Sequence, residues 1–595
     1  MRGMLGGLMI LGASMLTACS SDDINDPAKI KPGSDPDYYI HLQIEFPKDG
    51  NTRSTTTDGG TSADMQLDAF DKENGISKIT LYFFDATGTT SATNGQLICS
   101  FSTSGNPALD VTQGSDKVSY TLVQQVSYDD LRAMFGKYNH IYAIANIDGP
   151  TVTVNAPGAT GVTTESSFLS DNKVTVADIT SASLARSFAT GYNNNLPMAN
   201  YSCYNLDLTS FKDKINANST NGEVINAVTS LFTGTYGDGR LWDASTYAKS
   251  DNGNVDALRL ERMVARIDYK DGASTSIAPN TYKLANHSME IVSGSTKSNE
   301  DVYLCVQSLQ LFNVNKSSYY FRHTATGTNS GVTYDATNGF PVSPFGVEKG
   351  SDASAYNWVA DPSWVTKYNI TPADNSLALA SSNSLFFNQP TEDSEGVWSI
   401  TGNTSRTATT TFADWIENAS DADKTTIGSG YAPWYYLPEN TVPSTSKMTT
   451  HFCTGIAFHV LVMKKSDDTY VPVTKTDAPE LRINRNDGYY QEPEWKDGEA
   501  GSYPAGYYLT YKYLIPHNIS TNTDASTDGS VDGNTGLWTS VGPMQYAVVR
   551  NNVYQLCLTG IENLPNYHEP DNVILSIDLR VMDWNARWDE EVVLH

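Results

Sequence analysis

Alternation of apolar and polar residues is the dominant pattern along the chain, and it predicts strands rather than helices. The first clear example lies near the N-terminus, in residues 38–46. Its apolar residues occupy every second position, and they are Ile40, Leu42, Ile44 and Phe46. Successive side chains of a strand point to opposite faces. The spacing therefore predicts a half-buried strand with these four side chains facing a core.

Segments of the same kind recur in both halves of the chain. They span residues 78–85, 96–102, 118–126, 141–147, 265–269, 302–312, 456–464, 507–515, 546–558, 573–582 and 592–594. A short helix is predicted at residues 128–135, and residues 210–231 form a second, more polar helical window. Tracts rich in Ser, Thr, Asn and Gly, such as residues 521–536, predict surface loops. No short fixed repeat is visible, which argues against a solenoid or a propeller.

We therefore predict an all-β fold, with a few short helices, made of two β-sandwich domains in tandem. The best boundary is the polar loop at residues 248–254. It divides the chain into an N-terminal domain, residues 54–250, and a C-terminal domain, residues 251–595. A division is expected because 595 residues exceed what one hydrophobic core usually accommodates.

A segment near the C-terminus repeats the alternation of the first strand. Its apolar face consists of Val573, Leu575, Ile577, Leu579 and Val581. Burial of four or five such side chains contributes about 6–15 kcal/mol before ordering costs are subtracted. By pattern alone, either segment could fill the same place in a sheet. An ordinary internal strand has the same pattern, and from the pattern alone it is the favoured interpretation.

The N-terminus predicts export. Residues 1–18 contain one basic residue followed by an apolar stretch that is too short to span a bilayer comfortably, as in a secretion signal. The stretch ends in Leu-Thr-Ala before Cys19, which resembles the lipobox of bacterial lipoproteins. There the chain is cut before the cysteine, and the thiol carries a diacylglycerol. The acidic residues that follow, at 22–23, resemble a signal for the outer face of the outer membrane.

Charge and cysteine content exclude several other classes of protein. The formal net charge of −28 argues against nucleic-acid binding, because a phosphate binder needs a basic surface. Apart from Cys19, the cysteines are far apart and include no CxxC pair. Neither a zinc ribbon nor a thioredoxin-type redox pair is therefore encoded. We expect most of these thiols to be buried, with at most two disulfides.

Motifs for catalysis and cofactor binding are missing. The sequence has no GxSxG, P-loop, HExxH or GxGxxG motif. Asp524, Asp528 and Asp532 resemble part of a calcium loop, but the twelfth position holds Thr535 instead of the required Glu. We therefore predict no enzyme activity, no cofactor and no metal site.

One arginine lies in a segment that a protease could reach. Arg53 is surrounded by polar residues and glycines, and residues 48–60 contain almost nothing apolar. A cut between Arg53 and Ser54 would release a lipidated propeptide, residues 19–53, together with the first predicted strand. The loss of that strand would leave an open apolar groove. Another molecule could fill it by donor-strand addition, and head-to-tail repetition would make a filament.

Four further motifs lie in the same order as in a known family. They are YAIANI at residues 142–147, LPM at 196–198, LERMVARID at 260–268 and VVRNNVY at 548–554. Together with the lipobox and the Arg53 segment, they resemble the fimbrillins, which are the subunits of type V pili on Gram-negative anaerobes. The length and the C-terminal pattern are most similar to the Mfa-type shaft subunit of the minor fimbrium.

This resemblance implies how the protein is exported, cleaved and assembled. Fimbrillins have two transthyretin-like β-sandwich domains and reach the cell surface as lipoproteins. An Arg-specific protease then removes the N-terminal segment, and a C-terminal strand of another subunit fills the groove. Carried over, Arg53 and Ser54 match the cleavage position, residues 40–46 the removed strand, and residues 572–595 the region that includes the donor.

The resemblance also implies partners and a location. The partners are copies of the same chain, accessory tip and anchor pilins, and the protease, in a surface fimbrium that serves adhesion and biofilm formation; no receptor is identified. A tip or anchor pilin remains an alternative to a shaft subunit. From other classes, a glycan-binding surface lipoprotein and a secreted hydrolase with two carboxylates in a cleft also remain open.

Overall fold

The structure is a computed structural model that describes most of the chain. The described residues are 38–45, 66–68, 76–88, 95–104, 109–114, 117–126, 128–156, 158–170, 173–175, 196–211, 232–234, 241–243, 248–249, 258–328, 330–345, 356–370, 385–387, 390–392, 398–399, 431–449, 451–485, 488–498, 504–517, 544–566, 571 and 574–585. Within these ranges, no helix is long and apolar enough to cross a membrane.

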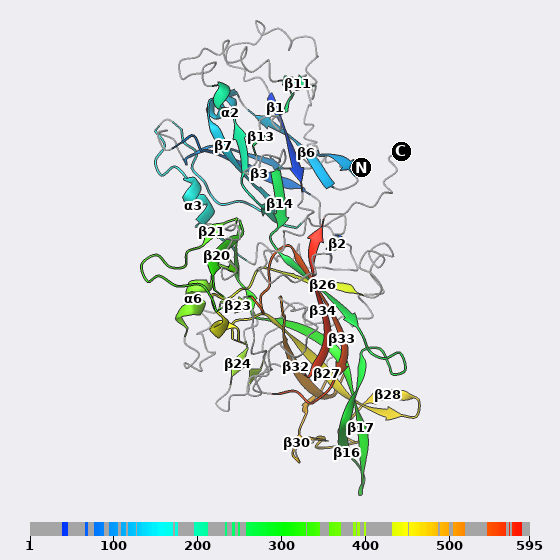
Figure 1. Cartoon of the computed structure of the whole chain (residues 1–595). Helices are drawn as coiled ribbons and strands as arrows, with labels where there is room; N and C mark the ends of the chain where they lie inside the picture. The colour runs from blue at the N-terminus through cyan, green and yellow to red at the C-terminus, as the bar shows by residue number, and fades with distance from the viewer. Residues whose placement is uncertain are drawn as a thin grey trace, which may run out of the picture.

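The N-terminal part of the molecule is a branched sheet of twelve strands (Figure 1). Its strands are β1 (Tyr38–Glu45), β3 (Lys78–Asp85), β4 (Leu97–Ser104), β5 (Leu109–Gly114), β6 (Lys117–Val126), β7 (Tyr138–Ala145), β9 (Met198–Asn200), β10 (Tyr204–Asp207), β11 (Phe232–Gly234), β12 (Leu241–Asp243), β13 (Ala248–Lys249) and β14 (Leu258–Arg262). β14 joins two groups of strands, because it pairs with β1 on one side and with β9 on the other. Side chains from both groups form one apolar core.

Two sheets form the larger C-terminal part. The first has the order β2-β34-β33-β15-β26, and the second has the order β30-β29-β16-β17-β27-β32-β31, with β28 beside β27. The first sheet contains β2 (Gln66–Asp68), β15 (Ala265–Asp271), β26 (Ala432–Leu437), β33 (Asn552–Ile561) and β34 (Leu575–Asn585). The second contains β16 (Thr281–Ser293), β17 (Thr296–Phe312), β27 (Gly455–Ser466), β28 (Thr469–Pro472), β29 (Arg482–Asn484), β30 (Tyr490–Gln491), β31 (Glu494–Lys496) and β32 (Gly506–Leu514). A second apolar core takes side chains from both sheets.

Shorter elements pack around these sheets. The strands are β8 (Lys173–Thr175), β18 (Val314–Asn315), β19 (Ser317–Tyr319), β20 (His323–Gly327), β21 (Ser343–Pro344), β22 (Tyr356–Ala360), β23 (Phe386–Phe387), β24 (Thr391–Glu392) and β25 (Trp398–Ser399). The helices are α2 (Tyr128–Met134), α3 (Glu165–Ser170), α6 (Trp364–Asn369) and the 3-10 turns η2 (Thr209–Phe211) and η4 (Thr445–Lys447). β8 pairs with β19, so an N-terminal segment reaches into the C-terminal half.

The all-β prediction is confirmed. The predicted helix at residues 128–135 is α2, and the strand predicted at residues 78–85 is β3 with the same bounds. Most of the helical window at residues 210–231 lies outside the described residues. The chain passes from the first sheet to the C-terminal sheets at Met263 and Val264, between β14 and β15.

Candidate functional site

β1 is a central strand with neighbours on both of its edges. On one edge it runs antiparallel to β6 along its whole length, from Tyr38 opposite Val126 to Glu45 opposite Ser119. On the other edge it runs parallel to β12 first and to β14 further on. We call the space that β1 occupies between these strands the β1 slot.

The inward side chains of β1 are fully buried, as their alternation predicted. Ile40 and Leu42 are each 1% exposed and Ile44 is 0% exposed, in the same core as Leu122 and Leu258. Burial of three such side chains stabilises a fold by about 5–9 kcal/mol before ordering costs. Removal of β1 would therefore open a long apolar groove with unpaired backbone groups along both edges.

Several predicted site residues lie outside the described residues. These are Cys19, Phe46, Arg53, Ser54 and Val573. The lipidation site and the cleavage site therefore stay predictions. β1 nevertheless precedes Arg53, whereas all other described strands follow it. A cut after Arg53 would leave β1 without a covalent link to any other described strand.

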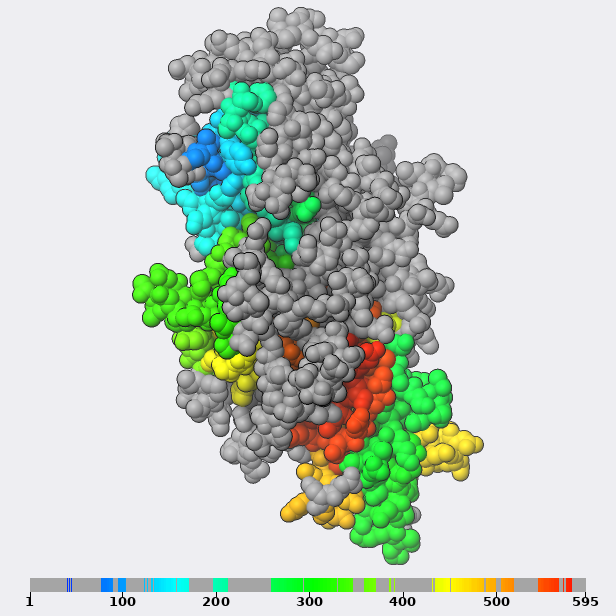
Figure 2. Space-filling view, viewed as in Figure 1, coloured from blue at the N-terminus to red at the C-terminus, as the bar shows by residue number. Residues whose placement is uncertain are grey.

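The second predicted segment, β34, lies near the edge of the other sheet. It runs antiparallel to β33 from Leu575 opposite Ile561 to Asp583 opposite Asn552. Among the described strands, its other edge carries the short β2 alone, which pairs with residues 583–585. On the face shown in Figure 2, red atoms of the C-terminal segment lie at the surface beside the green β16–β17 region.

The apolar face of β34 is less deeply buried than that of β1. Leu575 is 3% exposed, whereas Ile577 and Leu579 are only partly buried against the core. Asp578, on the opposite face, is exposed. Val581 lies in β34 opposite Tyr554. In the single chain, this segment is thus an internal strand of its own sheet.

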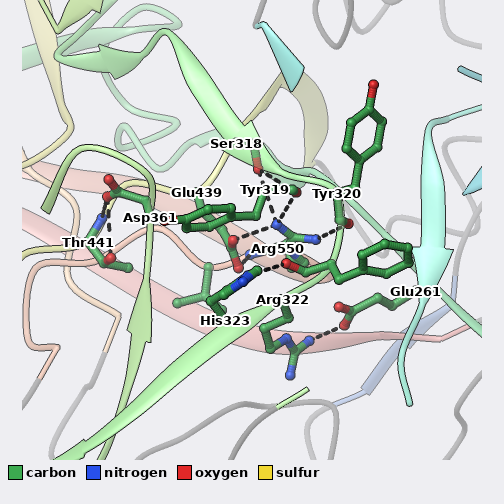
Figure 3. Close-up of polar contacts among 12 residues, drawn as sticks. Glu261, Ser318, Tyr319, Tyr320, Arg322, His323, Asp361, Glu439, Thr441 and Arg550 are labelled. Carbon is green, nitrogen blue, oxygen red and sulfur yellow. Dashed lines mark hydrogen bonds and ion pairs between the residues drawn. The ribbon is translucent and has the colours of Figure 1, made fainter. Parts of the chain in front are cut away.

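A cluster of buried charges connects the two halves of the molecule (Figure 3). We call Glu261, Arg322, Glu439 and Arg550 the buried polar cluster. The Arg550 guanidinium donates to Glu439 Oε2 at 2.8 Å and to the carbonyl oxygens of Tyr319 and Tyr320, each at 2.8 Å. Arg322 donates to Glu261 at the end of β14. Both ion pairs are almost completely buried.

Two of the motifs that carried the family resemblance meet at this cluster. The backbone N–H of Asn551 donates to Val264 O at 2.9 Å, and Arg262 Nη1 donates to Asn551 Oδ1 at 3.2 Å. A third motif joins them, because Met263 N–H donates to Pro197 O at 2.9 Å. Motifs that are far apart in the sequence therefore form one contiguous connection between the sheets.

Two buried carboxyl groups bind their protons unusually tightly. Burial raises the pKa of Glu261 to about 7 and outweighs the opposing charges of Arg322 and Arg550. Burial also raises the pKa of Asp571 to about 7, against the opposing effect of Lys512. Glu261 belongs to β14, which flanks β1, and Asp571 accepts the backbone N–H of Lys512 at 2.7 Å just before β34.

Two other predictions concern the cysteines and the acidic loop. Cys99, Cys203, Cys305, Cys453 and Cys557 form no disulfide; Cys99, Cys453 and Cys557 are buried, and Cys203 and Cys305 are partly buried. The acidic loop around Asp524 lies outside the described residues.

Several solved structures of fimbrial and adhesion proteins are similar to this chain. No protein-family model matches it, and the comparison with curated proteins gives no match. A fimbrilin from Porphyromonas gingivalis is similar at 12% identity and a TM-score of 0.33, over 93% of this chain and 98% of that one. A protein assigned to cell adhesion from Parabacteroides distasonis is similar at 12% identity and a TM-score of 0.32, over 93% and 98%.

A tip fimbrial protein, Mfa3 of Porphyromonas gingivalis, is also similar, at 12% identity and a TM-score of 0.27, over 92% of this chain and 100% of that one. These neighbours are of the kind that the sequence resemblance implies.

Proposed function

We propose that this chain is a structural subunit of a surface pilus that polymerises by strand exchange at the β1 slot. The observation that carries this proposal is the position of β1, which is central in its sheet, fully buried on its inner face, and separated from the other described strands by the segment that contains Arg53.

Maturation would proceed in two steps. The precursor would be held at the outer membrane by lipid on Cys19, with β1 completing the N-terminal core. Cleavage between Arg53 and Ser54 would then detach the lipidated segment from the rest of the chain. Once β1 leaves, a strand with the same alternation is needed to cover the core between β6, β12 and β14.

β34 has the properties expected of the replacement. In its own sheet it has one long partner, β33, and a less buried apolar face. In the β1 slot of another molecule it would have partners on both edges and would bury its apolar side chains completely. The exchange therefore gains backbone hydrogen bonds and apolar burial. Each subunit would offer one strand and accept one, which produces an open filament.

The first experiment tests the cut. Arg53→Ala is expected to yield intact precursor at the cell surface and no fibres, because β1 stays in its slot. Arg485→Ala, at an exposed arginine, is the matched control and should assemble normally. N-terminal sequencing of the wild-type protein should begin at Ser54. Abundant fibres from Arg53→Ala would refute the activation mechanism.

The second experiment tests the donor by disulfide trapping. In the precursor, Gln43 of β1 lies opposite Thr121 of β6. A donor that replaces β1 should bring Ser576 or Asp578 to that place, within the Cα separation that a disulfide spans. Thr121→Cys combined with Ser576→Cys or Asp578→Cys should therefore link neighbouring subunits in fibres.

The matched control pairs Thr121→Cys with Lys297→Cys, at an exposed position on β17, and should give no link. Deletion of residues 572–595 should also stop polymerisation, provided that the truncated monomer is shown to fold. Fibres that assemble without these residues would exclude β34 as the donor.

A second candidate function is a surface lipoprotein that binds glycans. It is favoured by two adjacent exposed aromatic residues, Tyr489 and Tyr490, which are 71% and 57% exposed and could stack on sugar rings. Such a protein would keep its lipid anchor, so N-terminal sequencing would give a blocked Cys19 instead of Ser54.

A further inference from the structure

Three side chains with metal-binding atoms converge in the N-terminal half, away from the β1 slot. His140 belongs to β7, Glu165 is the first residue of α3, and Cys203 lies between β9 and β10. One ligand atom from each residue lies within 4.8 Å of the other two. His140 Nδ1 and Glu165 Oε1 are 2.6 Å apart.

The surroundings hold these groups in place and leave them accessible. The side chains of His140 and Glu165 are 28% and 19% exposed, and Cys203 is partly buried with a free thiol. Tyr142 donates its hydroxyl to Glu165 Oε1, and the Cys203 Sγ lies 3.4 Å from Asn205 Oδ1. Partners of this kind orient the ligands of metal sites.

We propose that His140, Glu165 and Cys203 form a zinc site. The set combines an imidazole nitrogen, a carboxylate oxygen and a thiolate sulfur, and all three are ordinary zinc ligands. Calcium and magnesium prefer oxygen ligands alone, so the thiol disfavours them. Ligand atoms this close together can reach one tetrahedral ion after small side-chain rotations. Three protein ligands would leave the fourth position for water.

The site would also strengthen the contact between the two halves of the molecule. α3 carries Phe168, whose ring lies 4.7 Å from that of Tyr82 and 5.4 Å from that of Phe321. Tyr82 belongs to β3, and Phe321 lies two residues before the C-terminal strand β20. An ion that holds Glu165 to β7 would fix α3 over this aromatic contact. Zinc should therefore raise the thermal midpoint of the protein.

The test measures zinc on the purified full chain. After dialysis against ZnSO4 and then against metal-free buffer, elemental analysis should find one zinc per chain. His140→Ala, Glu165→Gln and Cys203→Ser should each weaken zinc binding by roughly 10–100-fold or more, because loss of a ligand costs at least as much as loss of an outer partner. Cys305→Ser, at a partly buried free thiol elsewhere, is the matched control and should bind normally.

Cobalt substitution tests the ligands without any mutation. The wild-type protein loaded with Co²⁺ should show the thiolate-to-cobalt band in the ultraviolet and the visible bands of a tetrahedral ion. Circular dichroism should show that the variants remain folded. The proposal is overturned if the wild-type protein retains no zinc, if Cys203→Ser binds zinc as tightly as the wild type, or if bound cobalt lacks the thiolate band.

Discussion

β1 and β34 have the same alternation of apolar residues, but they lie in very different sheet environments. β1 is paired on both edges, and its described inward side chains are at most 1% exposed. β34 has one long partner and a short one, and two of its apolar side chains are only partly buried. The same alternation of apolar residues therefore occurs at two very different degrees of burial.

This difference favours one direction for the proposed strand exchange. If β34 left its sheet, it would lose its long ladder with β33 and its short one with β2, whereas in the β1 slot it would gain partners along both edges. In the proposed maturation, the cut after Arg53 would allow this exchange, because a covalently attached β1 competes for its own slot at a very high effective concentration. The following predictions test whether the two strands differ in the way that their environments indicate.

The largest loss of stability is expected from substitution of Arg550, which lies just before β33, the long partner of β34. Arg550→Met would leave the buried Glu439 without its cation and remove the donors to Tyr319 O and Tyr320 O. Loss of one partner of a buried pair costs about 3–5 kcal/mol. Urea denaturation should show this loss, and hydrogen exchange should show faster exchange in β33 and β34 than in β1.

The control for Arg550 is an exposed ion pair in the same half. Arg482→Met removes a partner of Glu492 where the two side chains are 48% and 65% exposed, and should cost less than about 1 kcal/mol. Equal exchange rates in β1 and β34 of Arg550→Met would show that the two sheets do not open independently.

The next prediction compares the same substitution in both strands. Leu42→Ala in the β1 slot should destabilise the precursor by about 3 kcal/mol, because it leaves a cavity in a sealed core. Leu579→Ala in β34 should cost about 1 kcal/mol, because that side chain is only partly buried. Urea denaturation of the uncleaved protein measures both. A larger loss of stability for Leu579→Ala than for Leu42→Ala would contradict the expectation that β1 is the more deeply buried and more stabilising strand.

The sequence predicted the strands well because their signal is local. The burial of Ile40, Leu42 and Ile44 follows from period-two spacing, and α2 follows from a short helical pattern. Spacing could not predict that β1 is flanked on both edges, because β12 and β14 lie about two hundred residues further along the chain. The same limit applies to the partial exposure of β34, which depends on its neighbours.

The polar groups were harder to predict for the same reason. Arg550 and Glu439 are isolated charges in the sequence, and the resemblance of residues 548–554 to a family motif gave no indication of the partner. His140, Glu165 and Cys203 have no ligand spacing, because three separate elements bring them together. Only the hydrophobic alternation near His140 indicated that its strand is buried.

A smaller effect is expected when the pH is changed. Stability should fall with rising pH because of one carboxyl group beside β1 and one before β34. Glu261, beside β1, and Asp571, before β34, have pKa values of about 7 against ordinary values of 4.5 and 3.8. The folded chain thus binds these protons more tightly than the unfolded chain. Their contribution to stability is fully present below the ordinary pKa and is lost as pH rises through about 7.

Urea denaturation from pH 5 to pH 8 checks this dependence. Glu261→Gln and Asp571→Asn should each flatten the fall in stability, because an amide does not ionise. Asp335→Asn is the control, since hydrogen bonds from Asn338 and Thr337 lower the pKa of Asp335 and place its titration outside this window. An unchanged slope in Glu261→Gln would show that this carboxyl is already ionised at pH 5.

The smallest effect is expected on the outer face of β34. Ser576 Oγ donates to Glu562 Oε1 at 2.6 Å in an exposed position, so Ser576→Ala should change stability by no more than about 0.5 kcal/mol. Fibre assembly should also be unchanged, because the outer face is not the one that enters a core. A loss as large as that of Leu579→Ala would mean that side-chain hydrogen bonds, rather than apolar burial, hold β34 in its sheet. The lower burial of its inner face would then no longer be a reason to propose β34 as the donor strand.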